Sequence, residues 1–366
     1  MDPIRYDCKF YLGDRPCVWG GVCEGCEHYT PMGTRVLIVK LAAAGDVLRA
    51  TAVLPPLKSR YPESHVTWVC DKSALPLVSD NPYLDRAMPF GFETWLTLSR
   101  QQFDLIINLD KEPRAAALAV SVPAQFRLGF GLSDAGTVTA LSDGARYDLS
   151  LGLSNELKFN GNTRTYPDVF CEIADVEYEG EPYCLVLPEA SLRYAESFVA
   201  GLKARPPLVG LNVGAGPVFA NKAWTPEGFA ELARRVDSDL GGTALVLYGP
   251  EDRERAARTI ELGGGAAIDA GTHALMDFAG IVGSLDAIVT GDTMALHIGV
   301  ALRVPVVAIF GPTVPQEIDL YGKGSKIVAA IECAPCYLRS CDRSPSCMDS
   351  VGVDEVFAAL REAVAQ

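Results

Sequence analysis

Short apolar runs recur along the chain, and each is followed by a glycine or polar turn and then by a stretch with helical spacing. Apolar, β-branched runs that alternate with helices are typical of parallel strands buried on both faces. The pattern therefore predicts a helix-covered parallel sheet in each half of the chain. The predicted strands are Val36–Leu41, His65–Cys70 and Asp104–Leu109 in the first half, and Leu208–Val213, Ala244–Tyr248, Ala287–Thr290 and Val306–Phe310 in the second.

The break between the two series lies in a polar, turn-rich stretch from Leu153 to Pro188. A short helix is expected inside it at Val169–Ala174, and the chain ends in an amphipathic helix at Val353–Ala365. Two such series predict an α/β protein with two Rossmann-like, doubly wound domains that face a cleft. The predicted boundaries are a cysteine-rich extension at 1–32, a first domain at 33–184, a second domain at 185–345 and a C-terminal helix at 346–366.

Composition narrows the class of protein. The 366 residues carry 32 Lys and Arg against 46 Asp and Glu, a net charge of −14 that would repel nucleic acid. We see no secretory leader and no apolar run long enough to span a membrane, so we expect a cytoplasmic protein. In that compartment the 11 cysteines are expected to be thiols or metal ligands.

Ligands of doubly wound sheets bind outside the carboxyl ends of the strands, so the residues at those ends are the candidates for a site. Asp292 and Thr293 follow the predicted strand Ala287–Thr290 and open a helix that runs through Leu302. The free N–H groups and partial positive charge of a helix N-terminus bind phosphate. The alternative is that Asp292 or Thr293 only caps the helix.

A glycine turn with a lysine follows another strand of the second domain. In "GAGPVFANKAWTPEGF", Gly214 and Gly216 let the backbone approach a ligand closely, and Lys222 stands in the same loop. Thr225 and Pro226 predict the cap and first residue of the next helix. A glycine turn and one lysine suit a diphosphate, whereas the alternative is an ordinary surface loop.

Two further strand ends carry a carboxylate. In "LYGPEDRERA", Glu251 is placed to accept hydrogen bonds from ribose hydroxyls, or simply to start a helix. In "VKLAAAGDVLRA", Asp46 follows the first strand at a turn of small residues, with a helix expected from about Val47. An acidic side chain that faces the cleft is a candidate general base, and the alternative is again a capping role.

Four segments, taken together and in this order, resemble glycosyltransferase family 9, the ADP-heptose:lipopolysaccharide heptosyltransferase family. They are "LIVKLAAAGDVLRATAVLPPLK", "LNVGAGPVFANKAWTPEGFAELA", "YGPEDRERA" and "AIVTGDTMALHIGVALRVPVVAIFGPT". The resemblance runs from about Arg35 to the C-terminus. It implies the GT-B fold, with a nucleotide-sugar donor bound by the second domain and the acceptor by the first. It also implies inverting heptose transfer without a catalytic metal.

The resemblance also implies roles for single residues. Asp46 matches the base that deprotonates the acceptor hydroxyl. Lys222 matches a contact to the donor phosphates, and Glu251 matches a contact to the ribose. The implied diphosphate seat comprises Asp292, Thr293 and His297, with the Gly214 turn beside it.

Three positions keep alternatives open. Met294 stands where the family has a glycine after Asp-Thr, and a side chain there narrows the diphosphate seat. Ala-Ala replaces Ser-Ser before Gly-Asp, which removes hydroxyls that could touch ligand. These departures place the chain in a side branch and bear on the identity of the sugar. His297 faces either the ligand or the core, where a backbone partner would satisfy it.

Charged residues follow the strand Asp104–Leu109 in "NLDKEPRAA". By position, Asp110, Lys111 and Arg114 are candidates to face an anionic acceptor. Lipopolysaccharide cores carry carboxylates and phosphates, so basic groups there are chemically suitable. The alternative is a solvated run of charges.

Two cysteine clusters stand outside the predicted strands. Each has four thiols, the number of ligands that a zinc ion or an iron–sulfur cluster needs, and two of the four form a C-x2-C pair. A metal there would be structural, and disulfides or free thiols are the alternatives. The first cluster is Cys8, Cys17, Cys23 and Cys26, and the second, which is the weaker metal candidate, is Cys333, Cys336, Cys341 and Cys347.

The resemblance therefore implies an inverting glycosyltransferase that takes heptose or a related sugar from a nucleotide-sugar donor, with ADP-heptose expected. Its acceptor would be a lipopolysaccharide core or another glycan, including a protein-linked one, at the cytoplasmic face of the inner membrane. Two rivals remain at this stage. One is a nucleotide-sugar 2-epimerase of the same fold, and the other is a non-catalytic module that binds sugar nucleotide or metal.

Overall fold

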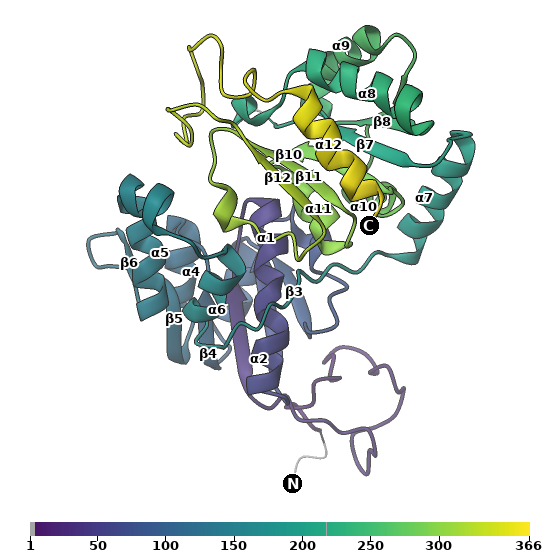
Figure 1. Cartoon of the computed structure of the whole chain (residues 1–366). Coiled ribbons are helices and arrows are strands. Elements are labelled where there is room, and N and C mark those ends of the chain that lie inside the picture. Colours follow the sequence, from purple (N-terminus) through teal and green to yellow (C-terminus); the bar gives the residue numbers. More distant parts are fainter. Residues whose placement is uncertain (1–3, 217) are drawn as a thin grey trace. The chain divides into compact units, whose positions relative to one another are not determined.

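The computed structural model describes residues 4–216 and 218–366 (Figure 1). The chain forms two compact units. The first unit contains the described part of Met1–Ser150 together with Pro167–Glu181, and the second contains Leu151–Tyr166 and Pro182–Gln366. The chain thus enters the second unit, returns to the first for one helix, and then completes the second.

The first unit has one six-stranded sheet in the order β3-β2-β1-β4-β5-β6. All neighbouring strands are parallel except β5 and β6, which pair antiparallel. The strands are β1 (Arg35–Val39), β2 (His65–Cys70), β3 (Arg86–Pro89), β4 (Phe103–Asn108), β5 (Ala124–Leu132) and β6 (Val138–Ala140). The helices are α1 (Ala44–Ala50), α2 (Leu54–Arg60), α3 (Phe92–Leu98), α4 (Pro113–Ser121), α5 (Asp143–Leu153) and α6 (Tyr166–Ile173).

The second unit has a six-stranded, fully parallel sheet in the order β12-β11-β10-β7-β8-β9. The strands are β7 (Leu208–Asn212), β8 (Thr243–Leu247), β9 (Ala267–Asp269), β10 (Ala287–Gly291), β11 (Val306–Phe310) and β12 (Gly324–Val328). The helices are α7 (Glu189–Gly201), α8 (Pro226–Leu240), α9 (Arg253–Gly263), α10 (Leu275–Gly283), α11 (Met294–Ala301) and α12 (Val353–Val364).

Each sheet grows outward in both directions from its first strand. The chain reverses its direction of growth between β1 and β4 in the first unit, and between β7 and β10 in the second. Loops that leave such neighbouring strands turn to opposite faces of the sheet, which opens a crevice at the carboxyl ends. The predicted doubly wound α/β class is confirmed, and each unit has a switch point of this kind.

Helix α12 closes the core of the second unit. Its buried residues include Val356, Phe357 and Leu360, which join the cluster formed by β7, β8, β10 and α8. Trp224 is also buried there, and its indole Nε1 donates to the carbonyl of Val351 at 3.1 Å. The C-terminal amphipathic helix is therefore part of this unit's core. Within the described residues, none of the helices combines the length and hydropathy that a bilayer span requires.

The carboxyl end of β4 lies so close to β5 that position 129 in β5 has no room for a side chain. Gly129 in β5 has a left-handed φ of +89°, and a Cβ there would lie 1.8 Å from the carbonyl oxygen of Asn108. Asn108 Nδ2 in turn donates to the Phe130 carbonyl at 2.8 Å, so β4 and β5 are held tightly at this end.

We predict that Gly129→Ala lowers the free energy of unfolding by about 3 kcal/mol, because it adds backbone strain and displaces β4. Gly136→Ala is the matched control, since Gly136 has a left-handed φ of +75° but open space around it. It should cost only about 1 kcal/mol. Urea unfolding of both variants measures the difference, and equal losses would contradict the close contact at Asn108.

Candidate active site

A buried polar network ties together the two strand ends that flank the crevice of the second unit. Asn212 is the last residue of β7, and its Nδ2 lies 3.0 Å from Thr290 Oγ1, 3.2 Å from Thr293 Oγ1 and 3.2 Å from the Gly214 carbonyl. The two threonine hydroxyls are themselves 3.0 Å apart. The network fixes the glycine turn against the start of α11. Neither Asn212 nor Thr290 was among the residues predicted from the sequence.

A cavity of about 410 Å³ opens beside this network. Its size is in the range of small-molecule sites in enzymes. Three predicted donor residues, Gly214, Glu251 and Thr293, line it, while Lys222, Asp292 and His297 do not. The other side chains on its wall include Tyr248, Asp252, His273, Leu275, Phe278 and Met294.

The glycine turn requires glycine at its first position. A Cβ on Gly214 would lie 2.5 Å from Asp252 Oδ2, and the same oxygen accepts from the Gly216 backbone N–H at 3.4 Å. Gly216 has a left-handed φ of +67°. Asp252 thus holds the turn, which faces the cavity with two glycines and the small side chain of Ala215. A backbone of this kind can approach a diphosphate closely.

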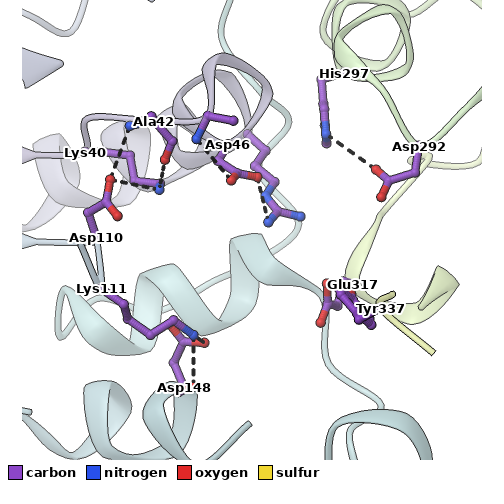
Figure 2. A network of polar contacts seen from close by, with 12 residues as sticks. Lys40, Ala42, Asp46, Asp110, Lys111, Asp148, Asp292, His297, Glu317 and Tyr337 are labelled. Carbon is purple, nitrogen blue, oxygen red and sulfur yellow. Dashed lines mark hydrogen bonds and ion pairs between the residues drawn. The ribbon is translucent and has the colours of Figure 1, made fainter. Parts of the chain in front are cut away.

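Lys222 and Asp292 form an ion pair at the mouth of α11. Lys222 Nζ lies 2.8 Å from Asp292 Oδ2 and 3.4 Å from the Asp292 carbonyl. The close approach is possible because Gly291 precedes Asp292, and a Cβ there would lie 2.6 Å from the Lys222 carbonyl oxygen. His297 is buried, and its Nε2 lies 3.9 Å from Asp292 Oδ1 (Figure 2). The histidine therefore faces the site residue Asp292.

Helix α11 begins at Met294, with Thr293 as its N-cap residue. The first backbone N–H groups of a helix have no partner within the helix, so they can donate to a ligand. Thr293 does not cap with its side chain, since its hydroxyl belongs to the network with Asn212. Met294 lines the cavity. The departure from the family pattern therefore places a thioether on the wall of the site.

The opposite wall carries the groups expected near a nucleoside. Glu251 lies in a short turn, Pro250–Asp252, and is exposed at the cavity. Tyr248 donates to Asp269 Oδ1 at 2.9 Å, and the Gly271 N–H donates to the same oxygen at 2.8 Å. Burial, followed by the hydrogen bond to Asp269, raises the pKa of Tyr248 above its ordinary value. Tyr248 therefore stays neutral and holds the loop after β9 in place.

In the first unit, Asp46 lies in the first turn of α1, because the helix starts at Ala44 and not near Val47 as predicted. Its Oδ1 lies 2.8 Å from an Arg49 guanidinium nitrogen, and its Oδ2 accepts from the Ala43 N–H at 3.3 Å (Figure 2). The side chain of Asp46 keeps 34% of its surface exposed. The carboxylate is thus oriented by two partners and still accessible to a substrate.

Asp110 has a different environment from the one predicted. It is 7% exposed, and its Oδ2 accepts from the N–H groups of Leu41 at 2.9 Å and Ala42 at 3.2 Å. The same oxygen lies 3.2 Å from Lys40 Nζ, which also donates to the Ala42 carbonyl (Figure 2). Asp110 therefore positions the turn between β1 and α1, and its buried carboxylate faces this turn and not an open surface.

The two basic acceptor candidates differ in their partners. Lys111 is one third exposed, and its Nζ lies 2.8 Å from the buried Asp148 Oδ1 (Figure 2). Arg114 is half exposed, and pairs with Glu112 Oε1 at 2.5 Å and with Asp71 Oδ2 at 3.4 Å. The hydrogen bond to Glu112 is the main reason that the pKa of Arg114 is raised. Both cations remain partly available to an anion.

A second buried polar group in the second unit was not predicted. Tyr337 Oη donates to Glu317 Oε2 at 3.0 Å (Figure 2). Lys158 Nζ lies over the Tyr337 ring, 3.6 Å from its centroid. Burial, then the charge of Glu317, raises the pKa of Tyr337 well above its ordinary value. Lys158 belongs to Leu151–Tyr166, the first segment of the chain to enter this unit, and it lies far from Tyr337 in the sequence, so no local pattern predicted the contact. The group anchors that segment to the loop after β11.

The cysteines are all free thiols in the described residues. Across residues 4–216 and 218–366, no three His, Cys, Asp or Glu side chains already surround a common metal position. The predicted metal sites are therefore not formed in this arrangement of side chains. In the C-terminal cluster, Cys347 is buried against Gly311. Burial, then the nearby thiols of Cys336, Cys341 and Cys333, raises its pKa.

We predict that Asp110→Ala lowers the free energy of unfolding by about 3 kcal/mol, because it leaves the Lys40 charge buried without its partner. Arg114→Ala, which removes an exposed cation, should cost less than about 1 kcal/mol. Thermal or urea unfolding measures both. Unchanged stability of Asp110→Ala, with weaker acceptor binding, would instead support the direct acceptor contact expected from the sequence.

The sequence and the structure of this chain were both compared with those of known proteins. Residues 92–346 match the sequence model described as glycosyltransferase family 9 (heptosyltransferase). The lipopolysaccharide core heptosyltransferase OpsX of Haemophilus influenzae is 22% identical over 317 residues, which cover 83% of this chain and 86% of OpsX.

Two solved structures share the fold. A family 9 glycosyl transferase from Veillonella parvula gives a TM-score of 0.72 at 21% identity, over 91% of this chain and 97% of that chain. The ADP-heptose lipopolysaccharide heptosyltransferase II of Escherichia coli gives 0.66 at 18% identity, over 91% and 99%. The predicted GT-B fold class is confirmed. Since the family match spans more than half of the sequence, this chain belongs to glycosyltransferase family 9 and is a transferase of the heptosyltransferase type.

Proposed function

We propose that this enzyme transfers heptose from ADP-heptose to a lipopolysaccharide core sugar, with inversion at the anomeric carbon. Membership of the heptosyltransferase family and the names of its relatives support the sugar and the acceptor class. The observation that carries the donor assignment is the cavity beside α11, with the Lys222–Asp292 pair next to it. The reaction would take place in the cytoplasm, at the membrane face that presents the lipid-linked acceptor.

The diphosphate is best placed between the glycine turn and the start of α11. The N–H groups at the first turn of α11 provide hydrogen-bond donors and partial positive charge. Lys222 adds a full positive charge at the same mouth, where its side chain is 17% exposed. The nucleoside would then extend along the cavity toward Glu251, whose carboxylate can accept hydrogen bonds from ribose hydroxyls.

Asp292 has a role that differs from that of the N–H groups around it. A carboxylate repels a diphosphate, but it accepts hydrogen bonds from sugar hydroxyls. Lys222 Nζ pairs with it at 2.8 Å, so its charge is partly compensated. We therefore assign Asp292 to the hydroxyls of the transferred sugar, next to the diphosphate. Lys222 then lies between the diphosphate and the transferred sugar, where it can contact the diphosphate while it pairs with Asp292.

Asp46 is the proposed general base. In an inverting transfer, the acceptor hydroxyl oxygen attacks the anomeric carbon from the face opposite the leaving group. Asp46 takes the hydroxyl proton, the glycosidic bond to the diphosphate breaks, and ADP leaves with the bonding electron pair. Arg49 and the Ala43 N–H orient the carboxylate for this step. Stabilisation of the leaving diphosphate by fixed dipoles and Lys222 requires no catalytic metal.

Lys111 and Arg114 are the candidates for acceptor contacts in the first unit. They are partly exposed, and they follow the carboxyl end of β4, beside the point where the sheet reverses its growth. Their charges suit the carboxylates and phosphates of a lipopolysaccharide core.

A 2-epimerase would need a second set of acid and base groups around the donor sugar. The family match favours the transferase over this alternative.

Calorimetric titration with ADP, UDP and GDP tests the donor assignment. We expect selective ADP binding, and we expect Lys222→Ala to weaken it by about tenfold or more, since a charge-assisted hydrogen bond contributes about 1.5–3 kcal/mol. Lys323→Ala in the same unit is the control and should bind ADP like the wild type.

Part of that loss would come from the Asp292 charge left without Lys222. The double variant Lys222→Ala/Asp292→Asn separates the two effects, because it removes the repulsion and should recover part of the affinity. Preference for UDP or GDP, or ADP binding unaffected by Lys222→Ala, would overturn the assignment.

A further inference from the structure

The N-terminal extension has almost no regular structure. Among residues 4–34, the structure shows no helix and no paired strand beyond a single bridge between Cys8 and Pro31. Figure 1 shows the segment as an irregular purple loop. Its backbone nevertheless follows a defined path, with turn hydrogen bonds such as Gly20 N–H to Cys17 and Cys26 N–H to Cys23.

The extension also lacks a hydrophobic core. Cys8 is the only buried residue that the structure describes between residues 4 and 34. Large apolar side chains lie at the surface instead, with Val18 75% and Val22 80% exposed. A segment of this size cannot bury enough apolar surface to hold one conformation, and small domains without a core depend on metals or disulfides. Something other than packing must hold this loop together.

The four cysteines of the extension share one cavity. Cys8, Cys17, Cys23 and Cys26 all line an opening of about 670 Å³, although 18 positions separate the first from the last. Gly25 has a left-handed φ of +70° and turns the chain between Cys23 and Cys26. His28 lines the same cavity but is stacked on Trp19, with ring centroids 4.0 Å apart. The four thiols are therefore the candidate ligand set.

We propose that these four cysteines bind a structural metal centre, either a zinc ion or an iron–sulfur cluster, as four thiolates. Each thiol releases its proton on binding, since the thiolate is the ligand. No three of these side chains yet surround one point, so the loop closes around the metal as the bonds form. Metal binding and ordering of the extension are then one process, as in zinc fingers.

The C-terminal cluster does not carry the same inference. Its segment is already anchored without a metal, since Asn221 Nδ2 donates to the Leu338 carbonyl at 2.8 Å and the Cys336 N–H donates to Pro312 at 3.1 Å. Cys347 packs in the core of the second unit. The need for a cross-link is therefore specific to the extension.

The test uses the full chain, purified without chelator and under anaerobic conditions, with metal content measured by mass spectrometry. We expect about one zinc, or iron with acid-labile sulfide and a brown absorbance, per extension. Cys23→Ser should lose that metal, while Cys184→Ser, outside both clusters, and Cys341→Ser, in the C-terminal cluster, should keep it. Zinc and iron–sulfur content distinguish the two centres.

Limited trypsin digestion gives a second readout. Lys9 and Arg15 are exposed in the extension. Chelator treatment, or Cys23→Ser, should speed cleavage at these sites while the thermal transition of the two larger units is unchanged. The proposal is overturned if the wild type holds no metal, if Cys23→Ser retains it, or if peptide mapping finds the four cysteines in disulfides.

Discussion

The proposed donor site depends on the hydrogen bonds of one buried asparagine. Asn212 ends β7 beside the point where the sheet reverses its growth, and its amide reaches Thr290 in β10, Thr293 at the start of α11 and the Gly214 carbonyl. Strands alone would place these segments near one another, since Thr290 and Asn212 are register partners. The amide fixes the turn and the helix mouth to a single geometry. A buried donor without these acceptors would cost free energy, which makes the arrangement specific.

In the first unit, a buried ion pair fixes the turn after a strand in a similar way. Asn108 ends β4, and its Oδ1 accepts from the Asp110 N–H at 3.0 Å. Asp110 then holds the turn after β1 through Lys40 and two backbone N–H groups. Asp46 lies just after this turn, in the first turn of α1, and its carboxylate remains accessible to solvent. In each unit, buried polar groups fix the strand ends, and a neighbouring group is the one proposed to act on the ligand.

Charge is the second constraint on the mechanism. The chain carries a net charge of −14, yet the proposed donor bears a diphosphate. Lys222 is already paired with Asp292, so it supplies orientation and only part of the positive potential. Backbone N–H groups of the glycine turn and of α11 provide the rest without adding a side chain. Because these donors are backbone groups, the proposed site is built from a loop and the end of a helix.

Much of the fold was predictable from periodicity. The seven predicted strands are all present within two residues at each end, and Thr225 caps α8 with Pro226 as its first residue. Five strands were missed. Strands β3, β6 and β9 have only three or four residues and lie at sheet edges, while β5 and β12 mix polar residues and glycines with apolar ones and so show no continuous apolar run. The glycine turn and the α11 mouth were predictable as local signals. The inward orientation of Asp110 and the contacts of Asn212 were not, since they depend on residues about 70 to 80 positions away.

A transfer assay tests most directly whether the enzyme transfers heptose with Asp46 as the base. The assay combines ADP-heptose, a lipopolysaccharide core acceptor and either the wild type or Asp46→Asn, with the product measured by mass spectrometry. We expect product formation by the wild type and a kcat lower by about 10²–10⁴ in the variant, with unchanged ADP affinity. A variant that retains the wild-type kcat, or a wild type that binds ADP but forms no product, would contradict this expectation.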